Sequence, residues 1–240
     1  MEENMKKVLS MILAAAMLVS LAACGKDTIP SDGMTYAQYQ AAALDSEVTV
    51  YTYFQDTQSW WEKEGQGVAS IYTQDKDGGY FLYECKVSKD VFDKLKAGTM
   101  IRVKGYKSEW AGEVEITDCS LEIVDTKSTY VAKAADITSI YGTDAVAEKI
   151  NQRIAVKGLT VSSPATYKWD GSGSRGDDLY LKVTLNGTEY TMVVESYLRG
   201  KDTDTYKAVE NLKAGDKIDI EGFLYWYNGA QPHITDVTVK

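Results

Sequence analysis

Short stretches of the chain alternate apolar and polar residues, the period-two pattern that is typical of β-strands with one buried face. Ile101 and Val103 flank an arginine in one of the clearest stretches. An Asn186-Gly187 pair joins two others, and this pair is a strong signal for a hairpin. The predicted strands are residues 48–54, 69–73, 80–87, 154–161, 179–185 and 188–195, and the strands that follow residues 98 and 215. The pattern therefore predicts a mainly β chain.

The segment that begins at residue 95 occurs again from residue 212. Three glycines in each copy align at one constant spacing: Gly98, Gly105 and Gly112 match Gly215, Gly222 and Gly229. A repeat of this length indicates that one supersecondary unit is present twice. The middle glycine of each copy falls inside a strand, where a residue without a Cβ lets the strand bend sharply.

The last strand of each copy changes its alternation partway along. In the first copy, Ile116 lies on one parity and Leu121 on the other, and the second copy changes in the same way. A period-two element cannot switch faces without an extra residue, so the sequence predicts β-bulges near Asp118 and Asp236. A bend and a bulge in each copy are what a short sheet needs in order to curl into a barrel.

Helical signals stand before and inside each copy. Thr35 and Gln38 form a capping box, with Met34 and Tyr39 placed as a hydrophobic staple, and an alanine-rich run follows to residue 44. The other predicted helices cover residues 88–95, 144–150 and 204–212. Each copy thus has the order β-β-β-α-β-β with a helix in front.

Five short strands with a helix between the third and the fourth resemble the OB-fold, a five-stranded Greek-key barrel. The resemblance implies two tandem OB-fold-like barrels. Residues 35–127 are the first predicted domain, and residues 128–240 are the second, with a preceding helical linker. A fold of this kind does not by itself imply a function.

Residues 1–24 have the form of a targeting signal. Two lysines precede an apolar run over residues 8–18, which is short for a membrane-spanning helix, and Leu21-Ala-Ala-Cys24 closes it. The closing motif resembles a bacterial lipobox, which implies lipidation of Cys24 and anchoring at the outer face of the cell membrane. A plain secretory signal with an incidental cysteine is the alternative. Residues 25–34 are polar and are expected to form a tether.

A lipobox followed by tandem OB-like units resembles uncharacterised lipoproteins of Gram-positive bacteria, a group with no known activity to transfer. The chain has a formal net charge of −9. Nucleic-acid binding depends on neutralising phosphates with Lys and Arg, so an acidic chain outside the cell is a poor candidate for it.

Catalysis has few candidate residues. His233 is the only histidine, and the sequence has no Cys-x-x-Cys, no His-Glu-x-x-His and no phosphate-binding glycine loop. His233 is therefore expected at the surface or at a barrel rim, and the protein is expected to be non-catalytic and without a cofactor. Cys119 matches a core position of the second copy. Cys85 can face either way, so a Cys85–Cys119 disulfide and two free thiols are both open.

The segment between the first two strands of the second copy carries three aspartates, Asp170, Asp177 and Asp178. Carboxylate and loop carbonyl oxygens are the ligands that Ca²⁺ prefers, although the spacing here does not match an EF-hand loop. The alternative is a mobile, solvated connection that binds no metal.

The five tryptophans are the strongest functional signal. They are Trp60 and Trp61 after the first strand of copy one, Trp169 after that of copy two, and Trp110 and Trp226 just before the last turn of each copy. All five belong to the loops called L12 and L45 in OB-folds, which flank the face that binds oligonucleotides and oligosaccharides. With Tyr225 and Tyr227 beside Trp226, the sequence predicts an aromatic patch at one rim of each barrel.

The predicted function is non-catalytic binding of a glycan-like or peptide ligand by these rims, on a lipid-anchored protein. Two alternatives stay open. The aromatic residues can instead form an interface between the barrels or with a partner protein. Single-stranded nucleic-acid binding is favoured by what other OB-folds do and is disfavoured by the charge.

Overall fold

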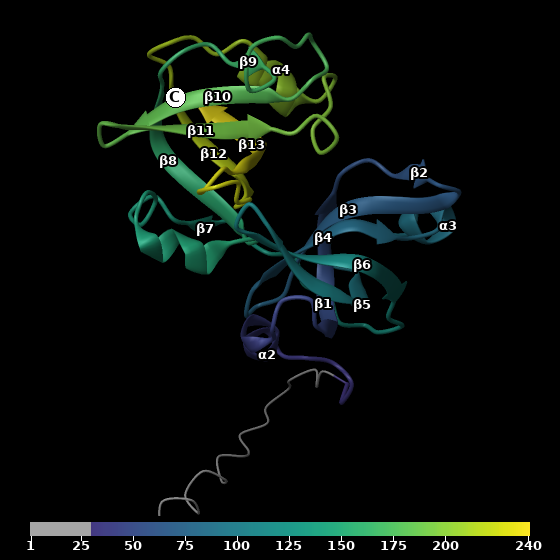
Figure 1. The fold of residues 1–240 in the computed structure, drawn as a ribbon. Helices are drawn as coiled ribbons and strands as arrows, with labels where there is room; N and C mark the ends of the chain where they lie inside the picture. The colour runs from purple at the N-terminus through teal and green to yellow at the C-terminus, as the bar shows by residue number, and fades with distance from the viewer. Residues whose placement is uncertain (1–29) are drawn as a thin grey trace, which may run out of the picture.

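The computed structural model describes residues 30–240 and shows two β lobes, joined by residues 124–152 (Figure 1). The signal peptide expected at residues 1–24, the lipidation site Cys24 and most of the tether lie outside the described residues. Among residues 30–240, none of the helices has the length and apolar character needed to cross a bilayer.

The first lobe is a closed five-stranded barrel. Its strands pair in the order β1-β5-β6-β4-β3, and a β1–β3 pairing closes the ring. The strands are β1 (Glu47–Thr57), β3 (Gln66–Gln74), β4 (Gly79–Lys86), β5 (Met100–Trp110) and β6 (Glu113–Ile123), and a short β2 (Trp61–Lys63) extends β3. β4 and β6 are the one parallel pair of this ring. This is the strand order of the OB-fold.

The second lobe repeats the same ring. Its strands pair in the order β8-β12-β13-β11-β10, a β8–β10 pairing closes the barrel, and β11 and β13 are parallel. The strands are β8 (Arg153–Val161), β10 (Leu179–Leu185), β11 (Thr188–Val194), β12 (Lys217–Phe223) and β13 (His233–Val239). Two short strands, β7 (Ala135–Asp136) and β9 (Thr166–Tyr167), are added at the edges. The prediction of two tandem OB-like barrels is confirmed.

The helices lie where the sequence places them but are shorter than expected. α2 (Tyr36–Ala41) begins after the predicted capping box, in which Thr35 Oγ1 accepts from the Gln38 backbone N–H and Gln38 Oε1 accepts from the Thr35 backbone N–H. α3 (Lys89–Phe92) and α4 (Asp204–Glu210) connect the third and fourth strands of their barrels. The helix expected at residues 144–150 is a 3₁₀ helix, η1 (Asp144–Lys149).

Both predicted bulges are present in the last strands. Opposite Gly105 on β5, β6 has two residues, Asp118 and Cys119, and Asp118 adopts a left-handed φ of 45°. In barrel 2 the β12–β13 register shifts before Gly222, with Thr235 as the extra residue. The parity change in the sequence therefore marks a real irregularity in each ladder.

The mid-strand glycines are required because the neighbouring strand approaches them closely. A Cβ on Gly105 would lie 2.5 Å from the Cβ of Cys119, and one on Gly222 would lie 2.1 Å from the carbonyl oxygen of His233. A glycine at each position lets the fourth and fifth strands pack tightly where the bulge bends the sheet.

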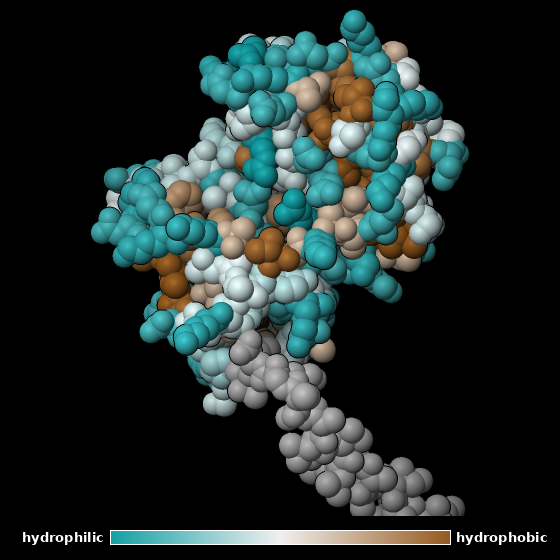
Figure 2. Space-filling model, turned by 180° about the vertical axis from the view of Figure 1, so that it is seen from behind, coloured by the Kyte–Doolittle hydropathy of each residue, from teal (hydrophilic) through white to brown (hydrophobic). Residues whose placement is uncertain are grey.

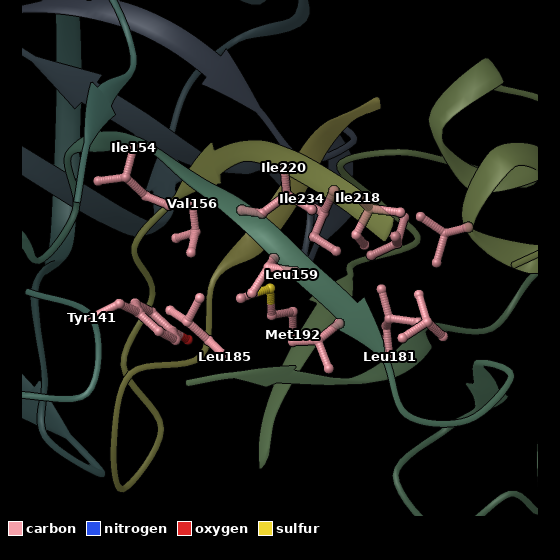
Figure 3. Packing of buried hydrophobic residues seen from close by; sticks show 14 of the residues in the cluster. Tyr141, Ile154, Val156, Leu159, Leu181, Leu185, Met192, Ile218, Ile220 and Ile234 are labelled. Atoms are coloured by element: carbon pink, nitrogen blue, oxygen red, sulfur yellow. The ribbon is translucent and has the colours of Figure 1, made fainter. Parts of the chain in front are cut away.

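Each barrel has its own apolar core. In barrel 2, Val156 and Leu159 from β8 point toward Ile220 from β12 and Met192 from β11 (Figure 3). Seen from behind, the surface over both lobes is largely hydrophilic, with apolar residues in separate patches (Figure 2). Apolar burial inside each ring is therefore what stabilises the individual barrels.

The two cysteines of barrel 1 lie side by side in its core. Both are fully buried free thiols, which confirms that Cys119 is a core residue and shows that Cys85 faces inward. Leu82 faces Ile116 three residues earlier on the parallel strands β4 and β6, so the register places Cys85 opposite Cys119. A hydrogen bond with the Cys85 thiol, together with burial, raises the pKa of the Cys119 thiol.

Candidate ligand cavity between the barrels

A third apolar cluster joins the two barrels. Tyr72 on β3 stacks on Phe223 at the end of β12, with ring centroids 4.3 Å apart and planes 7° from parallel. The Tyr72 hydroxyl shares a hydrogen bond of 2.9 Å with Nδ1 of His233. Phe81 and Leu198 complete this buried cluster, which we call the seam. Stacked aromatic rings that exclude water favour one fixed arrangement of the two lobes.

Polar contacts extend the seam on both sides. Arg199 forms an ion pair with Asp56, with an Nη2–Oδ2 distance of 2.5 Å. The Gln74 Oε1 atom accepts from the Arg153 backbone N–H at 2.8 Å. These bonds run from barrel 1 to barrel 2 and hold the strands that flank the aromatic stack in register.

Glu113 is a fully buried carboxyl group beside the seam. One of its carboxylate oxygens accepts from the Trp226 backbone N–H at 2.8 Å, and the other has no hydrogen-bond partner. Nearby, Asn151 donates to the Val114 carbonyl at 2.8 Å, and its own side-chain oxygen is also without a partner. Burial raises the pKa of Glu113 to about 8, so this side chain is largely protonated at neutral pH.

A cavity of about 680 Å³ opens beside the seam. It is lined by residues from both barrels, chiefly from β4, the end of β5, β10, β11 and the loops before β10 and β13. The lining residues are Gln58, Phe81, Tyr83, Trp110, Trp169, Asp178, Tyr180, Thr191, Val193, Glu195, Tyr225, Tyr227, Gln231 and His233. This volume is in the range of ordinary small-molecule sites.

Exposed aromatic rings are the main feature of the cavity lining. Tyr83 and Trp110 of barrel 1 are 45% and 56% exposed, and Trp169 and Tyr227 of barrel 2 are 78% and 46% exposed. The rings of Trp110 and Tyr227 meet across the domain boundary at 5.2 Å between centroids. Tyr225 lies deeper and stacks on His233 at 4.3 Å. Large rings left open to solvent around one concave site mark a binding surface.

The cavity belongs to the face of barrel 2 that binds ligands in other OB-folds. Tyr180 and Thr191 come from the second and third strands of that barrel, and Trp169 and Tyr227 come from its L12 and L45 loops. Barrel 1 contributes Phe81, Tyr83 and Trp110 to this site, so the ligand face of barrel 2 is bordered by residues of both barrels.

A bulge in β4 lies next to Tyr83, which shares the cavity-facing side of the strand with Phe81. Opposite Ser70 on β3, β4 has two residues, Tyr83 and Glu84, and Glu84 adopts a left-handed φ of 46°. The Glu84 backbone N–H donates to Ser70 Oγ at 3.2 Å, which satisfies a group that the interrupted ladder leaves free. Bulges of this kind redirect side chains next to functional sites.

The charges in the lining are all negative. Asp178 and Glu195 are its acidic residues, and none of the lining residues is Lys or Arg. Burial raises the pKa of Glu195 to about 7, and the neighbouring charge of Asp178 adds to this effect. Burial also lowers the pKa of His233 to about 3, so the histidine is neutral.

The structure brings four of the seven predicted binding residues together. Trp110, Trp169, Tyr225 and Tyr227 line the cavity, although they come from two barrels and not from one rim each. Trp226 instead packs against the core of barrel 2 and reaches Gly112 of barrel 1, where a Cβ would lie 2.7 Å from its ring. Part of the aromatic set therefore forms the interface between the barrels.

Trp60 and Trp61 lie outside the cavity. The Trp60 ring packs against the core of barrel 1, and its Nε1–H donates to the Val87 carbonyl at 3.0 Å. Trp61 lies half-buried on β2 opposite Val68. Trp60 directly precedes β2 and Trp61 begins it, and neither residue lies with the tryptophans that line the cavity.

Three cavity residues, Tyr83, Tyr180 and Glu195, are not among those predicted from the sequence. Tyr180 alternates with buried neighbours on β10, so an outward aromatic residue on the second strand was a visible signal. Tyr83 alternates with the core residue Leu82 on β4, so it was also visible as an outward aromatic residue. Glu195 is buried at the end of β11, and a glutamate at that position gives no sign of burial in the sequence.

The expectation that His233 lies at the surface or a rim is wrong. Only 6% of the side chain is exposed, because Tyr72 and Tyr225 cover it from both sides of the seam. It is a neutral, hydrogen-bonded residue of an aromatic cluster.

The aspartate-rich loop is held by its own hydrogen bonds. Asp177 Oδ2 accepts from the Ser174 backbone N–H at 2.9 Å, and Asp178 Oδ1 accepts from the Ser196 backbone N–H at 2.8 Å. Arg175 of the same loop pairs with Glu210 of α4. Within residues 30–240, no group of three or more His, Cys, Asp or Glu side chains is arranged to hold a metal ion.

Comparisons with known proteins found similarity only at the level of solved structures. No family model matches the chain, and no curated protein matches it. It is similar to the Ifi202 HINa domain in complex with 20-bp dsDNA (TM-score 0.35, 13% identity, 81% of this chain and 98% of that chain). It is also similar to a murine DNA-binding protein bound to dsDNA (TM-score 0.34, 14% identity, 80% of this chain and 94% of that chain). A third similar structure is a replication protein A heterotrimer bound to ssDNA (TM-score 0.35, 12% identity, 89% of this chain and 52% of that chain).

Proposed function

We propose that this protein binds a ligand, without catalysing a reaction, in the cavity between its two barrels. One observation carries the proposal: four exposed aromatic rings, two from each barrel, surround a single concave site. The site lies on the strand face that OB-folds use for binding. Rings of this kind stack on sugar faces and on apolar or aromatic side chains, so a glycan-like or peptide ligand fits the lining.

Nucleic acid fits this cavity less well. A nucleic-acid strand brings a phosphate for every base, and phosphates are bound through Lys and Arg. The cavity lining instead carries Asp178 and Glu195 and has no Lys or Arg. Stacking of bases on the exposed rings is the feature that favours this second candidate, and the salt dependence of affinity separates the two.

Removal of the exposed rings is the test of the site. The full chain is screened against glycan, peptide and oligonucleotide arrays, and hits are measured by calorimetry. We expect Trp110→Ala and Tyr227→Ala each to weaken the best hit about tenfold or more, because a stacked aromatic contact contributes about 1–3 kcal/mol. Trp61→Ala is the matched control and should leave the affinity unchanged, since Trp61 is aromatic and partly exposed but lies outside the cavity.

Two outcomes would count against the proposed site. Equal losses in Trp61→Ala and Trp110→Ala would place the ligand elsewhere. Affinity that falls steeply with salt, confined to oligonucleotides, would replace the glycan or peptide ligand by nucleic acid.

We further propose that lipid on Cys24 holds the protein at the outer face of the bacterial cell membrane. The support is the motif Leu21-Ala-Ala-Cys24 after a short apolar run. In a bacterial host, Cys24→Ala is expected to move the protein from the membrane fraction to the medium or to block its processing. Mass spectrometry of the mature chain should show acyl groups on Cys24. An unmodified cysteine, or membrane association that survives the substitution, would contradict this anchoring.

A further inference from the structure

The two carboxylates of the cavity are held in place by the backbone. Asp178 Oδ1 accepts from the Ser196 N–H at 2.8 Å, and Glu195 Oε2 accepts from the Leu198 N–H at 2.7 Å. Both groups belong to the segments that flank β10 and β11, and each contributes to the cavity lining. Leu179 of β10 pairs with Val194 of β11, so Asp178 and Glu195 are the next residues of the two neighbouring segments, and the charge of Asp178 adds to burial in raising the pKa of Glu195. Two fixed carboxylates that repel each other are stabilised by a positive charge between them.

The rings around these carboxylates also favour a positive charge. The face of an aromatic ring carries a negative quadrupole, which attracts an ammonium group within about 6 Å. Tyr180 is two residues from Asp178, and its strand partner Val193 is two residues from Glu195. Burial raises the pKa of the Tyr180 hydroxyl, and the charges of Asp178 and Glu195 add to this effect. Trp110 and Tyr227 meet at the same site.

Within residues 30–240, no cationic side chain lines the cavity. No Lys or Arg is among its lining residues, and His233 is buried and held by Tyr72 and Tyr225. Arg199, which follows the seam residue Leu198, is engaged in its ion pair with Asp56. The negative charge of the lining is therefore available to a ligand.

We propose that the cavity selects ligands that carry an alkylammonium group, which would lie between the carboxylates of Asp178 and Glu195 and the rings of Trp110 and Tyr227. This inference rests on the proposed function and specifies the chemistry of its ligand. The ammonium group can belong to an amino sugar or to the lysine side chain of a peptide, because both present the same cation. A neutral ligand of equal shape stacks on the rings but does not neutralise the carboxylates.

A pair of isosteres isolates the charge. Calorimetry on the full chain compares choline with 3,3-dimethylbutan-1-ol, which has the same shape and no charge. We expect choline to bind at least tenfold more tightly. Glucosamine against glucose tests the sugar as the source of the ammonium group. An acetylated and amidated Gly-Lys-Gly peptide against its norleucine analogue tests the peptide.

Charge-removing variants assign the preference to the two carboxylates. Asp178→Asn and Glu195→Gln keep the shape and the backbone hydrogen bonds, since an amide oxygen accepts as a carboxylate does. In each variant, the preference for choline over 3,3-dimethylbutan-1-ol should fall to about threefold or less. Glu189→Gln, on the exposed side of β11 and outside the cavity, should keep the full preference. Thermal unfolding of each variant checks that it is folded.

The outcomes separate this inference from the proposed function. Equal binding of both isosteres, or a preference that survives in Asp178→Asn and Glu195→Gln, overturns the ammonium proposal. If neutral glycans or peptides still bind and Trp110→Ala still weakens them, the cavity stands as a binding site and only its charge selectivity is lost. If no probe or array ligand binds, both proposals fail.

Discussion

Replacing Tyr72 by alanine is expected to separate the two barrels and to cost about 3–5 kcal/mol of stability, the range for truncating a large buried aromatic side chain. Tyr72 is fully buried and stacks on Phe223 at 4.3 Å, so its removal leaves a void at the centre of the seam. Each barrel keeps its own apolar core. Calorimetric unfolding should therefore change from one cooperative transition to two, and small-angle scattering should show a larger radius of gyration.

Tyr72→Phe is the matched control for this substitution. It keeps the ring and removes only the hydroxyl that shares a hydrogen bond with His233 Nδ1. The expected loss is about 1–2 kcal/mol, and the single transition should remain. An alanine variant that unfolds in one transition, with unchanged scattering, would show that contacts other than the aromatic stack hold the barrels together.

The second large effect is a loss of stability as the pH rises from about 4.5 to about 8. The pKa of Glu113 is raised from 4.5 to about 8 by burial at the seam. The folded protein therefore keeps a proton that the unfolded chain releases near its ordinary pKa. The stabilisation that Glu113 contributes is fully present below about pH 4.5 and is lost as the pH rises through the pKa of the folded carboxyl group. The total loss of free energy of unfolding from this group is on the order of a few kcal/mol. Glu115 and Glu195, with pKa values raised to about 7, add losses of the same sign.

Glu113→Gln should remove the largest part of this pH dependence. An uncharged amide of the same shape can still accept from the Trp226 backbone N–H, so the variant should be more stable than the natural chain at pH 8 and similar to it at pH 4.5. Glu109→Gln, at an exposed position of the same hairpin, is the control and should leave the profile unchanged. Denaturant unfolding across this pH range measures the effect. A profile of Glu113→Gln that matches the natural chain would mean that Glu113 is ionised in the folded protein.

The features that the sequence predicts well are local. The parity change after Ile116 and the glycine at 105 mark a bulge and a close strand approach, because both act within one hairpin. Their repetition around Gly222 predicts a second barrel of the same kind. The capping box at Thr35 is equally local, and α2 begins where it predicts.

The features that the sequence does not predict depend on how the barrels meet. Tyr72 and Phe223 look like ordinary strand residues, and only their contact across the boundary makes them the centre of the seam. The same docking buries His233 and uses Trp226 for packing, and it turns Trp110 and Trp169 toward one cavity. A periodic pattern reports which face of a strand is buried, but it does not report what covers that face.

The most direct test of a ligand cavity built jointly by both barrels is a crystal structure of the full chain with its tightest array ligand. The ligand is predicted to lie against the rings of Trp110 and Tyr227, which contact each other, with Asp178 and Glu195 within hydrogen-bond distance of it. A ligand bound at an outer surface of one barrel, with the cavity between the barrels empty, would contradict the account.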